Sequence, residues 1–354
     1  MIRVVPIIPF INGLQKIHNI LLFYILQRDG HTGEIHESRI SWREGNIKKL
    51  SGIIASGIIF FICAYYIIHY FQWSVVIPLL THADWKWLPC TVTGTILCFW
   101  LFRTMRWFVL LKASDIHIDF YHLYMVCSMS VAFALLTPFQ SGEALKVELL
   151  KKTGSLERIP GYGIFMTERI LDLMVVLLMA LSGIIFGASK LLDTKVIFTV
   201  IALMIICFAF FFVIIRHIPP ANVVGRFFQP LNQCVRSGKI MATVVILTIG
   251  GWLFIVLGWY ASLRSISISV NFLDAAAMTA ITTLIGIFSF IPLSLGINEV
   301  SISSFLVYFK QDIPVAQAGA LIIRGYSVIT LIMGFVMFII WKLVLRRKMD
   351  SDYN

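Results

Sequence analysis

Long apolar runs, separated by short polar stretches, dominate the pattern along the chain. They cover residues 50–71, 88–111, 160–187, 196–215, 240–263 and 316–341. An α-helix needs about 20 predominantly apolar residues to cross the ~30 Å hydrocarbon core of a bilayer. The pattern therefore predicts about six full transmembrane helices.

Two further apolar stretches, 119–137 and 274–291, end in a different way. The first runs into Pro138 and Gly142, the second into Pro292 and Gly296, and each is followed by a short helix-compatible piece, 143–152 or 298–309. Proline removes a backbone donor, whereas glycine permits a sharp reversal. We therefore predict two helical hairpins whose tips contain these prolines and glycines, in the manner of broken helices that line a cavity.

The distribution of basic residues predicts the topology. If both hairpins return to the side from which they enter, the inner segments hold 18 Lys and Arg residues and the outer loops hold 5. Cytoplasmic loops carry such an excess. Three full spans separate the hairpins, so they point in opposite directions, as expected of an inverted-repeat transporter.

Composition agrees with a membrane protein. The chain has 354 residues, of which 59% are hydrophobic and 13% charged, and its mean hydropathy is +0.88. Soluble domains have roughly 45–50% apolar and about 25% charged residues. We predict an all-α polytopic membrane protein with re-entrant hairpins, divided into a cytoplasmic or interfacial segment (1–49), a transmembrane domain (50–345) and a cytoplasmic tail (346–354).

The net charge of +11 indicates contact with anionic lipid headgroups rather than nucleic acid. We expect a multi-pass protein of the inner (cytoplasmic) membrane with both termini in the cytoplasm. The sequence contains no nucleotide-binding or metal-binding pattern, so neither a cofactor nor a metal is expected.

Charged residues inside apolar spans are candidate site residues, because each costs roughly 2.5–3.5 kcal/mol at a helix centre. Span 160–187 contains Glu168, Arg169 and Asp172 within one helix turn. They form either a neutralised packing cluster or a polar site in which Arg169 binds a phosphate. Span 316–341 contains Arg324, which either pairs with Glu299 or binds substrate.

Each hairpin also carries a glutamate just after its glycine, Glu143 or Glu299. These glutamates either satisfy the amino-terminal ends of short helices or carry a proton or cation. Arg103 and Arg106 fall near the inner end of span 88–111. They either snorkel to the interface, with Trp107 in an aromatic belt, or contact a headgroup.

Several of these segments, in order from about residue 50 to 345, resemble a known family. They run from Arg103 to Trp107, from Thr137 to Lys146, from Glu168 to Asp172, from Phe290 to Glu299, and over Ile323 and Arg324. The resemblance is to the flippase-like membrane region of lysylphosphatidylglycerol synthases, here without the aminoacyl-transferase domain. The family usually has two glycines where this chain has Leu293 and Ser294.

The resemblance implies lipid translocation rather than lipid synthesis. We expect a flippase or transporter that moves an amphipathic, phosphate-bearing lipid through a polar cavity between the hairpins. The candidate substrate-binding residues are Arg169, Arg324, Glu143, Glu299, Glu168, Asp172, Arg103, Arg106 and Lys146. Lys146 is expected at the inner mouth with Lys151 and Lys152, where the three attract anionic lipid.

Two other functions remain open from the sequence. One is an intramembrane enzyme acting on a polyprenyl-phosphate or a phospholipid, with Glu143 or Glu299 as general base. The other is a non-catalytic partner of an enzyme that modifies envelope lipid or glycan. The sequence leaves open whether the chain forms a homo-oligomer.

Overall fold

The computed structural model describes residues 61–62, 64–187, 199, 202, 223–288 and 291–351, all within one compact unit, Ala55–Asn354. The predicted segment 1–49 lies outside the described residues, as do most of the spans 50–71 and 196–215. The described part is helical, with no strand in it. An all-α architecture is therefore confirmed.

Four predicted spans form long helices. They are α4 (Leu88–Ala113), α7 (Arg158–Gly187), α10 (Gly238–Ser265) and α13 (Ile313–Ser351). Of the described helices, α4, α10 and residues Ile313–Val344 of α13 are long and apolar enough to cross a membrane by length and composition. Helix α13 continues through most of the predicted tail.

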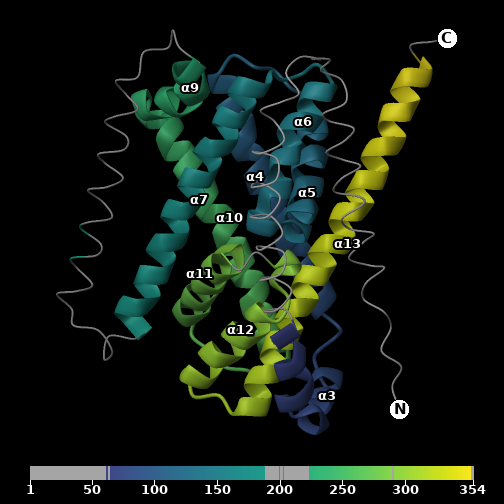
Figure 1. The fold of residues 1–354 in the computed structure, drawn as a ribbon, viewed down its shortest axis with the longest axis vertical. Coiled ribbons are helices and arrows are strands. Elements are labelled where there is room, and N and C mark those ends of the chain that lie inside the picture. The colour runs from purple at the N-terminus through teal and green to yellow at the C-terminus, as the bar shows by residue number, and fades with distance from the viewer. Residues whose placement is uncertain are drawn as a thin grey trace, which may run out of the picture. The chain divides into compact units, whose positions relative to one another are not determined.

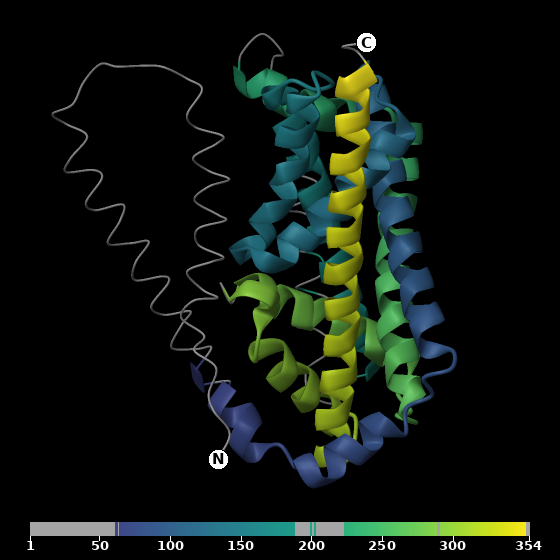
Figure 2. The same cartoon turned by 90° about the vertical axis from the view of Figure 1, so that its right-hand side faces the viewer.

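Both predicted hairpins are present. The first consists of α5 (Phe120–Leu136), the 3₁₀ segment η1 (Pro138–Ala144) and α6 (Leu145–Lys152). The second consists of α11 (Phe272–Phe288), η2 (Pro292–Ser294) and α12 (Ile297–Tyr308). In Figures 1 and 2 the first hairpin lies in the upper half of the bundle and the second in the lower half. Their broken segments meet, since η1 contacts α11 and η2 contacts α5.

Two short helices occupy segments that the sequence analysis treated as loops. Helix α3 (Trp73–Thr81) packs against α13, and α9 (Val223–Arg236) packs against α7. Leu231 and Cys234 of α9 are buried, and Cys234 joins the hydrophobic core around the first hairpin. For α9, an amphipathic pattern at helical spacing was the signal in the sequence that could have predicted the helix.

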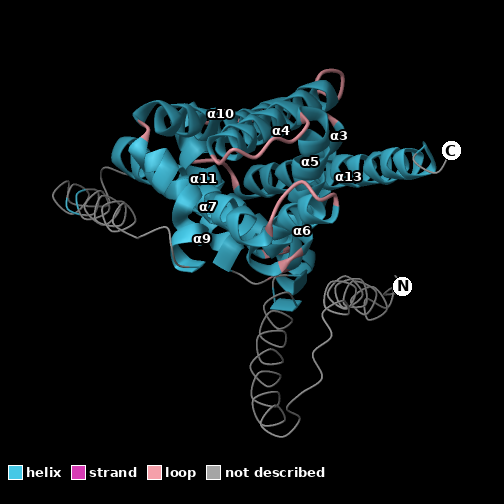
Figure 3. Cartoon of the chain, turned by 90° about the horizontal axis from the view of Figure 1, so that it is seen from above, coloured by secondary structure: helices cyan, strands magenta, loops and turns pink. Residues whose placement is uncertain are grey.

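Small residues let the long helices approach closely. Helices α4 and α10, side by side in Figure 3, form the most extensive pair. A Cβ on Gly250 of α10 would lie 2.3 Å from the Phe102 ring of α4, and one on Gly334 of α13 would lie 2.3 Å from the Cβ of Ala132 on α5. Small residues at helix interfaces are typical of membrane bundles.

The apolar core has two main parts, one around each hairpin. One part gathers side chains of α5, α6, α7 and α9 with the second half of α4. The other gathers α11, α12 and the first halves of α4 and α13. Each hairpin is thus packed against its own apolar surroundings, and its polar tip is directed toward the middle of the bundle.

Candidate functional site

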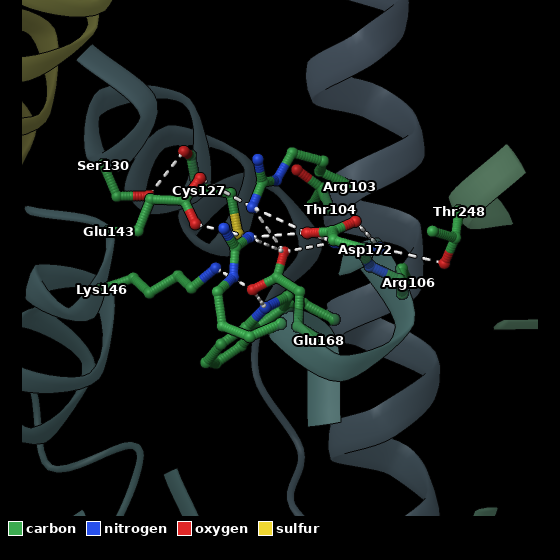
Figure 4. A network of polar contacts seen from close by, with 12 residues as sticks. Arg103, Thr104, Arg106, Cys127, Ser130, Glu143, Lys146, Glu168, Asp172 and Thr248 are labelled. Atoms are coloured by element: carbon green, nitrogen blue, oxygen red, sulfur yellow. Dashed lines mark hydrogen bonds and ion pairs between the residues drawn. The ribbon is translucent and has the colours of Figure 1, made fainter. Parts of the chain in front are cut away.

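Seven charged side chains from four elements form one ion cluster beside the first hairpin (Figure 4). Helix α4 supplies two arginines, the first hairpin supplies a glutamate and a lysine, and α7 supplies three residues. The members of this ion cluster are Arg103, Arg106, Glu143, Lys146, Glu168, Arg169 and Asp172.

Glu168 is the fully buried centre of the ion cluster. Its Oε1 accepts hydrogen bonds from Nη2 of Arg103 at 2.8 Å and from Nη2 of Arg106 at 2.5 Å. Its Oε2 accepts from Nε1 of Trp107 at 2.7 Å and from the ammonium of Lys146. Buried charges persist when they are paired in this way, so Glu168 ties α4 and α6 to α7.

Asp172 lies one helix turn further along α7. It accepts hydrogen bonds from Nη1 of Arg106 at 2.6 Å and from Nη2 of Arg169 at 2.7 Å. Nε1 of Trp252 approaches the same carboxylate at 3.3 Å, and Arg106 also donates to the Thr248 hydroxyl at 2.9 Å. These contacts bring α10 into the site.

Glu143 bridges two arginines from different helices. Its Oε1 lies 2.7 Å from Nη2 of Arg103, and its Oε2 lies 2.5 Å from Nη2 of Arg169. The interpretation of Glu143 as a helix cap is therefore wrong for this conformation. The N–H group of Gly142 donates instead to the Thr137 hydroxyl at 2.6 Å.

The ion cluster holds one more positive charge than negative charge, with four cations against three carboxylates. Its exposure is uneven: the Arg169 side chain is 25% exposed and that of Arg103 is 11% exposed, while Arg106, Glu143, Lys146 and Glu168 are at most 2% exposed. Among the described residues, Nε of Arg169 has no hydrogen-bond partner. The accessible edge therefore consists of Arg169, together with Arg103 and the Asp172 carboxylate, which is 12% exposed.

Three expectations about the residues around Glu168 are corrected. Arg106 is buried and hydrogen-bonded to carboxylates, so it does not snorkel, and Arg103 faces the same carboxylates. Trp107 is buried beside Glu168 rather than in an aromatic belt. Lys146 is also buried, with its ammonium 4.5 Å from the Trp107 ring centre, so it does not line an exposed mouth.

A second polar group lies at the tip of the other hairpin. The guanidinium of Arg324 donates through Nε to Glu299 and through Nη1 to the carbonyl oxygen of Leu293 at 2.8 Å. The other carboxylate oxygen of Glu299 accepts from the N–H group of Gly296 at 2.7 Å. Pairing of Arg324 with Glu299 and capping by Glu299 are therefore both confirmed.

The two tips depend on glycine for different reasons. A Cβ on Gly142 would lie 2.3 Å from the carbonyl oxygen of Phe133, so the first tip requires close backbone approach. At the second tip, Leu293, Ser294 and Gly296 have φ values of 57°, 48° and 86°. Left-handed backbone favours glycine. In this chain only Gly296 is a glycine, whereas Leu293 and Ser294 adopt this backbone with a side chain.

The structure brings seven of the nine candidate charged residues together and keeps two apart. The partners of Arg324 and Glu299 given above belong to the second tip, and none of them is a member of the ion cluster. A cavity of about 10 Å³ adjoins Glu299 and Arg324, enough for about one water molecule. A cavity of about 330 Å³ is lined by Ser114, Ile116, Gly154, Ser155, Leu156, Glu157, Pro160, Gln229 and Pro230, and so by no member of the ion cluster.

Four uncharged residues of the site were missed or misassigned from the sequence. Thr248 and Trp252 of α10 contact the ion cluster, Trp107 was assigned to the interface, and Thr137 caps the first tip. Only the position of Thr137 directly before the proline offered a local signal. The contacts of α10 depend on long-range packing, which spacing along the chain does not reveal.

Comparison with known families gives a match over most of the chain. The family model described as the lysylphosphatidylglycerol synthase TM region matches residues 51–335. A search of curated proteins gives no match. Since the matched region covers most of the chain and includes both hairpins and all seven residues of the ion cluster, the chain belongs to the family of the lysylphosphatidylglycerol synthase TM region.

Proposed function

We propose that the chain is a lipid flippase that moves a phosphate-bearing lipid between membrane leaflets, with the ion cluster as the headgroup site. Membership of the family links the chain to membrane lipids. The observation that carries the proposal is the excess positive charge of the ion cluster, whose most exposed side chain is that of Arg169. Arginine binds phosphate oxygens through two parallel hydrogen bonds.

The arrangement of the hairpins supports transport rather than simple binding. Broken helices that meet from opposite halves of a bundle are characteristic of transporters that expose a site alternately to the two sides. We propose that both hairpins are re-entrant and that the chain lies in the inner membrane with cytoplasmic termini. In the conformation described, the ion cluster is largely covered, so headgroup entry requires opening near Arg169.

The second tip is proposed to act as the opposite gate. Arg324 holds the backbone carbonyl of Leu293 and the carboxylate of Glu299 at once. Breaking these contacts would release the tip from α13. Arg324 would then serve the second hairpin, while Arg169 and Arg103 receive the headgroup.

The enzyme alternative finds less support. A general base needs a carboxylate oxygen within hydrogen-bond reach of the proton that it removes. Both oxygens of Glu299 accept hydrogen bonds within the tip, and both oxygens of Glu143 face arginines. We therefore favour positional and electrostatic roles for these glutamates.

Reconstitution in liposomes tests the proposal. Purified protein is assayed with fluorescent phosphatidylglycerol, and dithionite added outside reports the lipid that reaches the outer leaflet. We expect wild type to accelerate exchange and Arg169→Ala to slow it by at least about tenfold, the effect of losing a charged hydrogen bond. Arg226→Ala removes an exposed arginine outside the ion cluster and is the matched control. Equal rates for wild type, Arg169→Ala and Arg324→Ala would contradict the site assignment.

A further inference from the structure

Glu143 forms ion pairs with Arg103 and Arg169, the two most exposed arginines of the ion cluster. We propose that its carboxylate holds the place of a lipid phosphate, and that a headgroup bearing a phosphodiester monoanion displaces it from Arg103 and Arg169. This inference rests on the proposed function, since it names the headgroup class for the same site. In this inference Glu143 competes with the lipid phosphate for the two arginines, and so links headgroup binding to the first hairpin.

The geometry of Glu143 is that of a bridging anion. One carboxylate oxygen lies 2.7 Å from the guanidinium of Arg103 on α4, and the other lies 2.5 Å from that of Arg169 on α7. A phosphodiester also has two charged, non-bridging oxygens that guanidinium groups bind. It can therefore make the same two contacts without rearrangement of α4 or α7.

Glu143 is also the least firmly held carboxylate of the ion cluster. Glu168 and Asp172 each accept a hydrogen bond from an indole N–H in addition to those from cations. Oε2 of Glu143, by contrast, approaches Arg169 without the alignment of a hydrogen bond. Glu143 lies on the short η1 segment rather than on a long helix, so its displacement needs only a local change.

Charge balance defines the headgroup class. With Glu143 in place, the ion cluster has four cations and three carboxylates. If a phosphodiester monoanion replaces Glu143 and the displaced carboxylate moves out to water with the η1 segment, the buried charge is unchanged. The exchange then avoids the cost of burying an additional charge. A headgroup with a quaternary ammonium would place a positive charge near Arg169, and we expect it to bind more weakly.

Displacement would loosen the first tip. Glu143 connects η1 to both α4 and α7, and among the described residues Lys146 adds a third ion pair between this hairpin and the ion cluster, to Glu168. Headgroup binding would thus remove two of these three ion pairs, those of Glu143 with Arg103 and Arg169. This connects recognition of the lipid to opening of the hairpin.

Calorimetric titration of the full chain in detergent tests the inference. The probe is dihexanoylphosphatidylglycerol, and the variants are Glu143→Gln and the control Glu148→Gln. Glu148 lies on the same hairpin as Glu143, and its carboxylate pairs with Arg158 of α7. We expect Glu143→Gln to bind about tenfold more tightly than wild type, because a charged competitor is lost. Glu148→Gln should bind as wild type does, and dihexanoylphosphatidylcholine should bind more weakly to all three proteins.

Two outcomes would overturn the inference: no gain in affinity for Glu143→Gln, or a preference for phosphatidylcholine. If Glu143→Gln does not fold, Glu143→Asp retains the charge on a shorter side chain, and we expect about threefold tighter binding because its reach to both arginines is reduced. Unchanged affinity in that variant also contradicts the inference. Failure of wild type to move any lipid in liposomes contradicts the proposed function instead, and the binding result is read separately.

Discussion

Arg169 of α7 lies 2.5 Å from Glu143 of the first hairpin. The same relationship recurs in the other half of the chain, where Arg324 of α13 pairs with Glu299 of the second hairpin. In each half, a glutamate just after the hairpin glycine is bound by an arginine of the following long helix. The two halves of the chain thus share a physical feature, an ion pair that links each hairpin to the long helix after it.

The two links have different surroundings. Glu143 belongs to a cluster with excess cations, whereas Glu299 is bound by one arginine and one backbone N–H group. Arg324 also contacts a backbone carbonyl of the tip, which Arg169 is not observed to do among the described residues. We therefore expect substitutions in the first half to alter headgroup recognition and those in the second half to alter the tip.

Replacing Glu168 by glutamine should destabilise the protein strongly. Two arginines, a lysine and an indole N–H group converge on this carboxylate, so its loss leaves buried cations poorly balanced. Breaking a buried ion pair costs about 3–5 kcal/mol, and we expect a clear fall in the melting temperature in detergent. Glu157→Gln, at an exposed position, is the control and should melt as wild type does. Equal melting temperatures for both variants would contradict the central role of Glu168.

Replacing Leu293 by glycine should stabilise the second tip. Leu293 has a φ of 57°, and left-handed backbone costs an ordinary L-residue roughly 1–2 kcal/mol. We expect a gain of about 1 kcal/mol, because glycine also loses more chain entropy on folding. The neighbouring Leu295 is not among the left-handed residues, so Leu295→Gly should destabilise. Thermal melting of both variants checks the difference, and a loss of stability in Leu293→Gly would contradict the explanation.

Replacing Gly142 by alanine should disturb the first tip. The added Cβ would lie 2.3 Å from the Phe133 carbonyl oxygen, and overpacking of this kind costs about 1–3 kcal/mol. Gly94→Ala is the matched control, since nothing lies within 4 Å of its added Cβ. We expect slower lipid exchange and a lower melting temperature for Gly142→Ala alone. If Gly142→Ala matched Gly94→Ala in both assays, close backbone approach would not be essential.

Replacing Arg324 by lysine should loosen the second tip while keeping the charge. The planar guanidinium binds Glu299 and the Leu293 carbonyl together, and a lysine ammonium does not reproduce this fork. We expect faster hydrogen exchange of the backbone between residues 291 and 299. The control is Arg264→Lys, because Arg264 is exposed and bonds to Tyr260. Unchanged hydrogen exchange at the second tip would show that a positive charge at position 324 is sufficient to hold the tip.

Cysteine labelling should place the ends of the two hairpins that lie away from their tips on opposite sides of the membrane. Lys152 ends the first hairpin and Asp312 follows the second, and both are exposed. In a background lacking the native cysteines, Lys152→Cys should react with an impermeant maleimide only from the cytoplasmic side. Asp312→Cys should react only from the outside. Labelling of both from one side would exclude oppositely oriented hairpins.

The sequence by itself determined four long helices, both hairpins and their order along the chain, but not the short helices α3 and α9. Runs of apolar residues are sufficient to predict long helices, because a bilayer core requires helical hydrogen bonding within each segment. Proline followed by glycine was sufficient to predict both hairpins, because the backbone chemistry of these residues is local. The pairing of Arg324 with Glu299 was also among the alternatives, since both residues are costly in a membrane without a partner.

Only the tertiary structure decided which charges meet. Arg103 and Arg106 have the spacing of interfacial residues, yet packing of α4 against α7 places them beside Glu168 and Asp172. Lys146 is buried for the same reason, because α6 folds back onto α7. Ion pairs between distant segments depend on how helices pack, and that packing is settled by contacts along entire helix faces rather than by the local sequence around each charge.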